Sequence, residues 1–136
     1  MKKIINFDKS FEQTIIEKRL SLDDTYVVIL QGKRMQTLEA LYNELEAALQ
    51  LPSYFGRNWN ALDECLTDFS WISDKKIIIG INDFEKILYD FEFDITQANS
   101  EVEIFLDCLQ CAVNELKDNL KVYIQEKGVV YEILPE

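Results

Sequence analysis

The chain has 136 residues, 48% of them hydrophobic, and its 25 acidic and 14 basic side chains leave a formal net charge of −11. This length fits one domain, and this apolar fraction is enough to bury a core without disulfides or metals. A strongly acidic chain is repelled by nucleic-acid phosphates and by anionic lipid surfaces. Composition therefore disfavours nucleic-acid and membrane partners. The excess of acids has two possible explanations: it keeps the protein soluble, or it attracts a basic protein partner.

The cysteines and the start of the chain predict a cytoplasmic protein. Cys65, Cys108 and Cys111 are odd in number, and each lies in an apolar helical pattern, so we expect three reduced thiols on buried helix faces. The chain meets Asp8 before any apolar run long enough for a signal peptide. No later run reaches the ~20 apolar residues that a membrane span requires.

Residues 1–25 form an expected N-terminal extension. An apolar start is followed by apolar residues near helical spacing from Phe11 onward, which predicts a strand and then a helix packed on a domain of residues 26–136. That domain opens with a continuous β-branched run at residues 26–30, and a similar run occupies residues 76–81. Such runs, apolar on both faces, are typical of parallel strands covered by helices.

Two helices are expected between these strands. Leucines recur at helical spacing over residues 38–49 behind Thr37, which is a suitable N-cap. A second helix is predicted to begin after Asn58 and to bury one apolar stripe, leaving an acidic opposite face formed by Asn60, Glu64 and Asp68. Two helices of this kind make a crossover that lets the second strand run parallel to the first. A right-handed connection is strongly preferred in such a crossover.

The C-terminal part is predicted to hold a long helix and two strands. Ser100 and Glu103 form a capping box that predicts the start of the helix. Residues 121–126 alternate apolar and polar side chains, and Gly128 then precedes a second strand at residues 129–134. We therefore expect an α/β fold, a parallel sheet flanked by helices, with an extra antiparallel C-terminal strand at the sheet edge.

The most unusual segment runs from Leu51 to Asp68. Its loop combines a proline, two adjacent aromatic residues and a glycine directly before a helix N-cap, so large rings are held near the surface by a stiff backbone. Rigid aromatic residues beside a carboxylate-bearing helix suit a protein interface. Each ring could instead only cover the core beneath the start of the helix.

This segment resembles the barstar family of ribonuclease inhibitors over about residues 26–126. The matching residues are Leu51, Pro52, Tyr54, Phe55, Gly56, Asn58, Ala61, Leu62, Cys65 and Leu66. The resemblance implies a three-stranded parallel sheet flanked by helices. It also implies an inhibitor whose loop and following helix enter the active site of a ribonuclease, where a carboxylate takes the position of substrate phosphate.

The resemblance also implies which residues contact the partner. Carried over one by one, Tyr54, Gly56 and Asn58 would do so from the loop, and Asn60, Glu64 and Thr67 from the helix. Asn60 and Glu64 stand where the family has aspartates. Asp63 replaces a tryptophan that is common in the family and adds an acid one residue away from the expected contact face of the helix. It completes the set of expected contacts.

The expected partner is a basic ribonuclease or a ribonuclease toxin domain, bound one to one, with this chain acting as a bacterial immunity protein. Between residues 37 and 70 there are six acids and one base, Arg57, and such a field accelerates encounter with a basic cleft. The alternative is an acidic interaction domain that binds a different basic protein or a non-ribonuclease toxin.

Neither catalysis nor metal binding is predicted, and no cofactor is expected. The chain has no histidine and no glycine-rich phosphate loop. Asp63 and Glu64 are adjacent on a helix and so do not face each other as an acid and base pair would. The Cys108-x-x-Cys111 spacing has no second pair of ligands to complete a zinc site.

Overall fold

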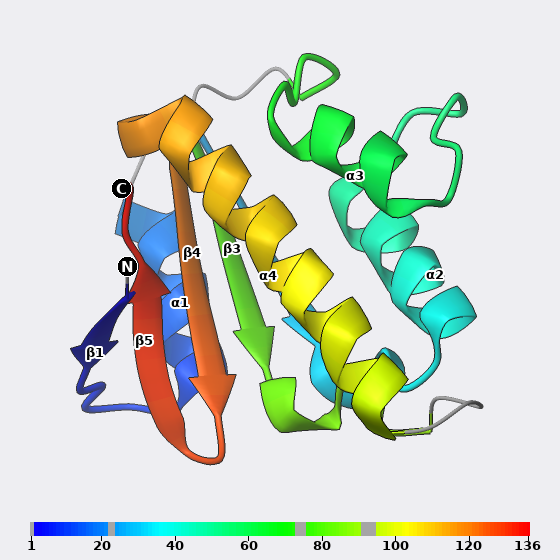
Figure 1. The fold of residues 1–136 in the computed structure, drawn as a ribbon. Helices are drawn as coiled ribbons and strands as arrows, with labels where there is room; N and C mark the ends of the chain where they lie inside the picture. Colours follow the sequence, from blue (N-terminus) through cyan, green and yellow to red (C-terminus); the bar gives the residue numbers. More distant parts are fainter. Residues whose placement is uncertain (1, 22–23, 73–75, 91–94) are drawn as a thin grey trace.

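The computed structural model describes residues 2–21, 24–72, 76–90 and 95–136. A five-stranded sheet lies at its centre, with strand order β1-β5-β4-β3-β2. Figure 1 shows the elements, which in chain order are β1 (Lys2–Ile5), α1 (Phe11–Ser21), β2 (Thr25–Gln31), η1 (Gly32–Arg34), α2 (Leu38–Leu49), α3 (Trp59–Leu66), β3 (Lys76–Asn82), η2 (Phe84–Lys86), α4 (Ile95–Leu116), η3 (Lys117–Asn119), β4 (Leu120–Glu126) and β5 (Val129–Ile133).

The three predicted parallel strands are present and adjacent. Ile79 of β3 lies opposite Val28 of β2 and Val122 of β4, and both pairings are parallel. β5 is antiparallel to β4, as predicted. Its expected place at the edge is wrong, because β1 pairs antiparallel with its other side and takes the edge position.

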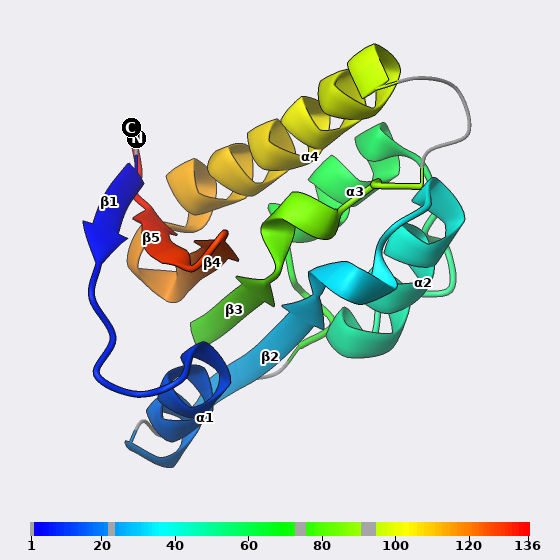
Figure 2. The same ribbon diagram turned by 90° about the horizontal axis from the view of Figure 1, so that it is seen from below.

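Helices cover the sheet unequally (Figure 2). α2, α3 and α4 lie on one face and bury a large core with β2, β3 and β4, whereas α1 lies on the other face. The smaller core on that face consists of Phe11, Ile15, Ile78, Tyr123 and Val130, with partly buried neighbours.

The N-terminal extension is packed closely against the sheet. A Cβ added at Gly80 would lie 3.1 Å from Ile15 Cγ1, so the glycine lets α1 approach β3 more closely than a larger residue would. β1 follows the length of β5, and Lys2 Nζ lies 4.6 Å from the ring centre of Tyr131.

Two local predictions in α4 are wrong. Ser100 does not cap the helix, because α4 has already begun at Ile95 and the Ser100 hydroxyl donates to the Thr96 carbonyl at 3.2 Å. Cys65 and Cys108 are buried as expected, but Cys111 is exposed. Three residues are less than one helical turn, so two such steps from the buried Phe105 carry Cys111 past the edge of the buried stripe. All three thiols are free.

Within the described residues, no helix is both long and apolar enough to cross a membrane.

Candidate partner-binding surface

The loop between α2 and α3 is anchored on one buried ring, that of Tyr42 in α2. Phe55 meets this ring edge-on at 5.8 Å between centroids, and Trp59 packs against it at 5.6 Å. The guanidinium of Arg57 lies 5.7 Å from the same ring centre. Every second residue from position 55 to 59 therefore contacts Tyr42.

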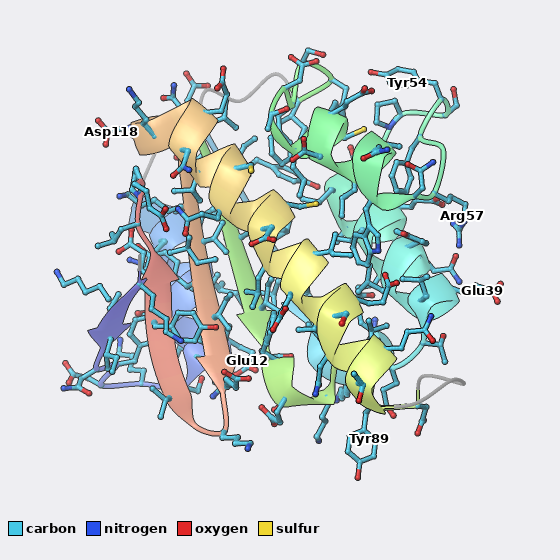
Figure 3. The ribbon with its side chains drawn as sticks, viewed as in Figure 1. Glu12, Glu39, Tyr54, Arg57, Tyr89 and Asp118 are labelled. Carbon is cyan, nitrogen blue, oxygen red and sulfur yellow. The ribbon has the colours of Figure 1, made fainter. Side chains whose placement is uncertain are left out.

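The residues between and beside these anchors face outward. Tyr54 is 73% exposed, and Gly56, Asn58 and Asn60 are exposed as well. Figure 3 shows Tyr54 at the outer side of the loop, on the same side of the molecule as Arg57. Of the three aromatic residues in this segment, Phe55 and Trp59 pack against the core, and only Tyr54 is presented to solvent.

Asn58 shapes the loop and starts α3, as predicted. Its side-chain oxygen accepts a hydrogen bond from the Ala61 amide at 2.8 Å, and its side-chain nitrogen donates to the Gly56 carbonyl at 3.2 Å. This N-cap satisfies an amide that the first turn of a helix leaves unpaired. The exposed side chain of Asn58 therefore uses both of its polar atoms within the loop.

The predicted contacts on α3 divide into two groups. Asn60 and Glu64 are exposed at i, i+4 on one outward stripe. Asp63 and Thr67 are half-buried, and the Thr67 hydroxyl donates to the Asp63 carbonyl at 2.9 Å. α3 ends at Leu66, so the exposed Asp68 lies beyond the helix and not on its face as expected.

Asp63 is close enough to α4 to affect its thiols. Burial raises the pKa of Cys108 to about 12, and the negative charge of Asp63 adds to this effect. Burial and Asp63 also raise the pKa of Cys111. The carboxylate of Asp63 therefore acts toward the α3–α4 contact, whereas Glu64 faces solvent.

A hollow of about 150 Å³ lies between the loop and α3. It is lined by Tyr54, Phe55, Ala61, Glu64, Cys65 and Asp68. Its lining thus combines two aromatic rings and smaller apolar groups with two carboxylates. A lysine or arginine side chain of a partner, with an apolar stem and a cationic head, is complementary to such a lining.

The structure reduces the acidic field predicted from the sequence. Glu46 forms an ion pair with Arg57, with 2.6 Å between Oε1 and Nη1. Glu44 keeps its negative charge, and one of its carboxylate oxygens accepts from the backbone amide of Gln31 at 3.0 Å. The five acids of the segment other than Glu46 are Glu39, Glu44, Asp63, Glu64 and Asp68, and two of them line the hollow.

The surface is supported by three residues that no sequence pattern placed in it, Tyr42, Arg57 and Glu101. Glu101 of α4 accepts a hydrogen bond from the indole nitrogen of Trp59, 42 positions away. Burial, followed by the charge of Glu101, raises the pKa of Tyr42 to about 12. The only sequence signal for Tyr42 is a large aromatic residue beside the leucine stripe of its helix.

Within the described part of the chain, no cluster of three or more His, Cys, Asp or Glu side chains is suited to a metal ion.

Comparison with known proteins gives two matches. The family described as Barstar (barnase inhibitor) matches residues 25–131. This range contains the predicted resemblance of 26–126 and continues into β5, which had been expected to lie outside it. A Bacillus subtilis (strain 168) protein named "Putative ribonuclease inhibitor YrdF" is 34% identical over 98 residues, which cover 72% of this chain and 97% of that protein.

Proposed function

Since the chain belongs to the barstar family of ribonuclease inhibitors, we propose that it binds a basic ribonuclease one to one and blocks its active site. The enzyme would be a secreted ribonuclease or a ribonuclease toxin, and the chain would protect the cytoplasm of the producing cell as an immunity protein. Three free thiols are compatible with that reducing compartment.

The observation that carries this proposal is the hollow flanked by Tyr54 and Glu64. Tyr54 is exposed while its neighbours anchor the loop, so its ring is available without rearrangement of the backbone. Large rings held in this way lose little conformational entropy on binding and are enriched among residues that dominate binding energy.

Charge supports a basic partner. Glu64 and Asp68 line the hollow, and the whole chain carries a net charge of −11. An active site that binds RNA phosphates presents cationic groups, so a carboxylate placed there can substitute for a phosphate. Complementary fields also accelerate encounter and oppose wrong partners.

The test is to titrate ribonuclease activity with the wild-type chain and with Glu64→Gln. We expect Glu64→Gln to weaken inhibition by ~2–5 kcal/mol, because a buried cationic group of the enzyme loses its counter-charge. Asp118→Asn is the matched control, since Asp118 is exposed and lies across the molecule from Tyr54 in Figure 3. The enzymes to test are basic ribonucleases of the host and the products of neighbouring genes.

Two outcomes would contradict the proposal. Glu64→Gln could inhibit as well as the wild type, or no ribonuclease could be inhibited at all. The second outcome favours the acidic interaction domain, in which the same surface binds a basic protein that is not a ribonuclease.

A further inference from the structure

Arg57 forms the densest polar network of the loop. Its Nη1 pairs with Glu46 at 2.6 Å, and its Nη2 donates to Asn43 Oδ1 at 3.0 Å and to the Glu39 carbonyl at 3.4 Å. The guanidinium also lies over the Tyr42 ring at 5.7 Å. All four contacts belong to α2, where positions 39, 43 and 46 follow one face of the helix.

The backbone at Arg57 needs such an anchor. Its φ is 53°, which lies in the left-handed region that residues with a Cβ adopt rarely. Conformations of this kind persist where surrounding contacts hold them in place. Arg57 stands between the exposed Gly56 and Asn58 and three residues after Tyr54, so its side chain ties the outward-facing part of the loop to α2.

The contacts depend on the shape of arginine as well as its charge. A guanidinium presents several donors in a fixed plane and can stack on an aromatic ring, whereas a lysine ammonium is a compact charge on a flexible stem. An exposed ion pair alone contributes little to stability. Here the ion pair is joined by an amide contact, a backbone carbonyl contact and a ring contact, all on one guanidinium.

The same ion pair also lowers the negative charge near the surface. Arg57 neutralises Glu46, and it is the one base among residues 37–70. Attraction of a basic partner is thus weaker than it would be without Arg57, while the loop that Arg57 ties to α2 is better ordered. The two effects act on different rate constants, since long-range charge changes association and loop order changes dissociation.

We propose that Arg57 is a positioning residue, which holds residues 53–58 in the conformation that presents Tyr54 to the partner at the expense of slower electrostatic association. This inference rests on the proposed function, because it assigns a role within the surface that binds the ribonuclease. Arg57 needs no direct contact with the partner for this role.

The experiment measures free and bound protein with three variants. Hydrogen exchange at the amides of residues 54–58 reports loop order in the free chain. Stopped-flow mixing with the ribonuclease that the wild-type chain inhibits gives the association and dissociation rate constants. For Arg57→Gln we expect faster exchange, dissociation faster by about tenfold, and association faster at low salt with a steeper salt dependence. Arg57→Lys keeps the charge, so we expect faster dissociation with unchanged association.

Lys9→Gln is the matched control. It removes another exposed ion pair, between Lys9 and Glu17 at 2.8 Å, next to α1 on the other face of the sheet. We expect it to leave exchange at residues 54–58 and the dissociation rate unchanged. A merely structural role for Arg57 would lower overall stability and leave exchange at residues 54–58 and the dissociation rate of Arg57→Lys unchanged, while Arg57→Gln would still associate faster at low salt because a positive charge is lost.

The outcomes separate the inference from the proposed function. Unchanged exchange at residues 54–58 in Arg57→Gln, or faster exchange with unchanged dissociation, overturns the inference while wild-type inhibition upholds the proposed function. If the wild-type chain binds no ribonuclease, the proposed function fails, and the binding role of Arg57 is overturned with it.

Discussion

The two faces of the sheet differ in what their cores support. On the face with three helices, a chain of aromatic contacts runs from Tyr42 through Trp59 and Phe105 to Phe84, with centroid distances of 5.6, 6.1 and 6.4 Å. This row of aromatic rings reaches the candidate binding loop. On the face with α1, Phe7 stacks on Phe11 at 6.0 Å and packs against Tyr123 at 6.2 Å, and these rings belong to the separate smaller core.

The difference indicates that stability and binding can be separated by mutation. Both cores contribute buried apolar area, so damage to either should lower the free energy of unfolding. The core under α2, α3 and α4 also positions the loop, so damage there should reach the partner. The core under α1 should affect binding only when the chain unfolds.

The largest expected effect comes from removing one buried ring on each face. Phe105 is 0% exposed and Phe11 is 3% exposed, and we expect Phe105→Ala and Phe11→Ala each to lower the free energy of unfolding by about 3–5 kcal/mol in urea titrations. Only Phe105→Ala should weaken inhibition, because Trp59 loses a neighbour. The milder Phe105→Leu and Phe11→Leu variants test the affinity if the alanine variants do not fold. Equal affinity for both leucine variants would remove the distinction between the faces.

A smaller effect is expected at alkaline pH. Burial raises the pKa of Tyr42, Tyr123 and Tyr131 from 10 to about 12, with carboxylate charges adding to it. Between these values the unfolded chain has released protons that the folded chain still holds, so stability falls as pH rises. Each tyrosine should contribute a slope of about 1.4 kcal/mol per pH unit between pH 10 and 12.

Phenylalanine variants test this prediction on both faces. Tyr42→Phe and Tyr123→Phe should each flatten the alkaline fall in stability by a similar amount, because one cooperative unfolding transition exposes both cores. Urea titrations at pH 8, 10 and 11 measure it. A flattening seen with only one variant would mean that the two cores unfold separately.

The two helix caps give an effect of about 1 kcal/mol. Thr37 caps α2 and Asn58 caps α3, each by accepting from the amide three residues later. Thr37→Ala and Asn58→Ala should lower the free energy of unfolding by similar amounts, about 1 kcal/mol. Asn58→Ala should also weaken inhibition, since the Gly56 contact is lost with the cap. If Thr37→Ala weakened inhibition equally, the cap at Asn58 would have no special role in the loop.

The smallest effect is expected at Glu39. It is exposed on α2 near Arg57, and Asp118 is exposed at the other side of the molecule (Figure 3). Glu39→Gln should slow association with the ribonuclease by about twofold at low salt, whereas Asp118→Asn should change it less, because separated surface charges are screened. The difference should vanish in high salt. A larger effect of Asp118→Asn would locate the acidic encounter surface elsewhere.

Much of the fold could be predicted from short-range patterns. The β-branched runs identified β2 and β3, and the leucine spacing behind Thr37 identified α2 with its cap. Asn58 was correctly placed at the start of α3. The motif from Leu51 to Asp68 also indicated the family that the comparison then showed. These features depend on neighbours within a few residues, which the sequence displays directly.

Other features required contacts between distant residues. Ser100 and Glu103 match a capping box, yet the helix continues through them because α4 has already begun at Ile95. Asp68 was expected on the face of α3, but the helix ends at Leu66, before that position. In both cases the local signal was compatible with several boundaries, and packing of the helix on the rest of the chain selected one.

The sequence by itself determined the parallel strands, the two crossover helices, the caps at Thr37 and Asn58 and the acidic, aromatic loop, because each follows from local periodicity and side-chain chemistry. Only the tertiary structure decided that β1 takes the sheet edge beside β5. It also decided that Arg57 neutralises Glu46 and that Tyr54 alone among the loop aromatics faces solvent. Strand neighbours and ion-pair partners far apart in the chain are selected by how the elements pack, and no pattern within one element records that choice.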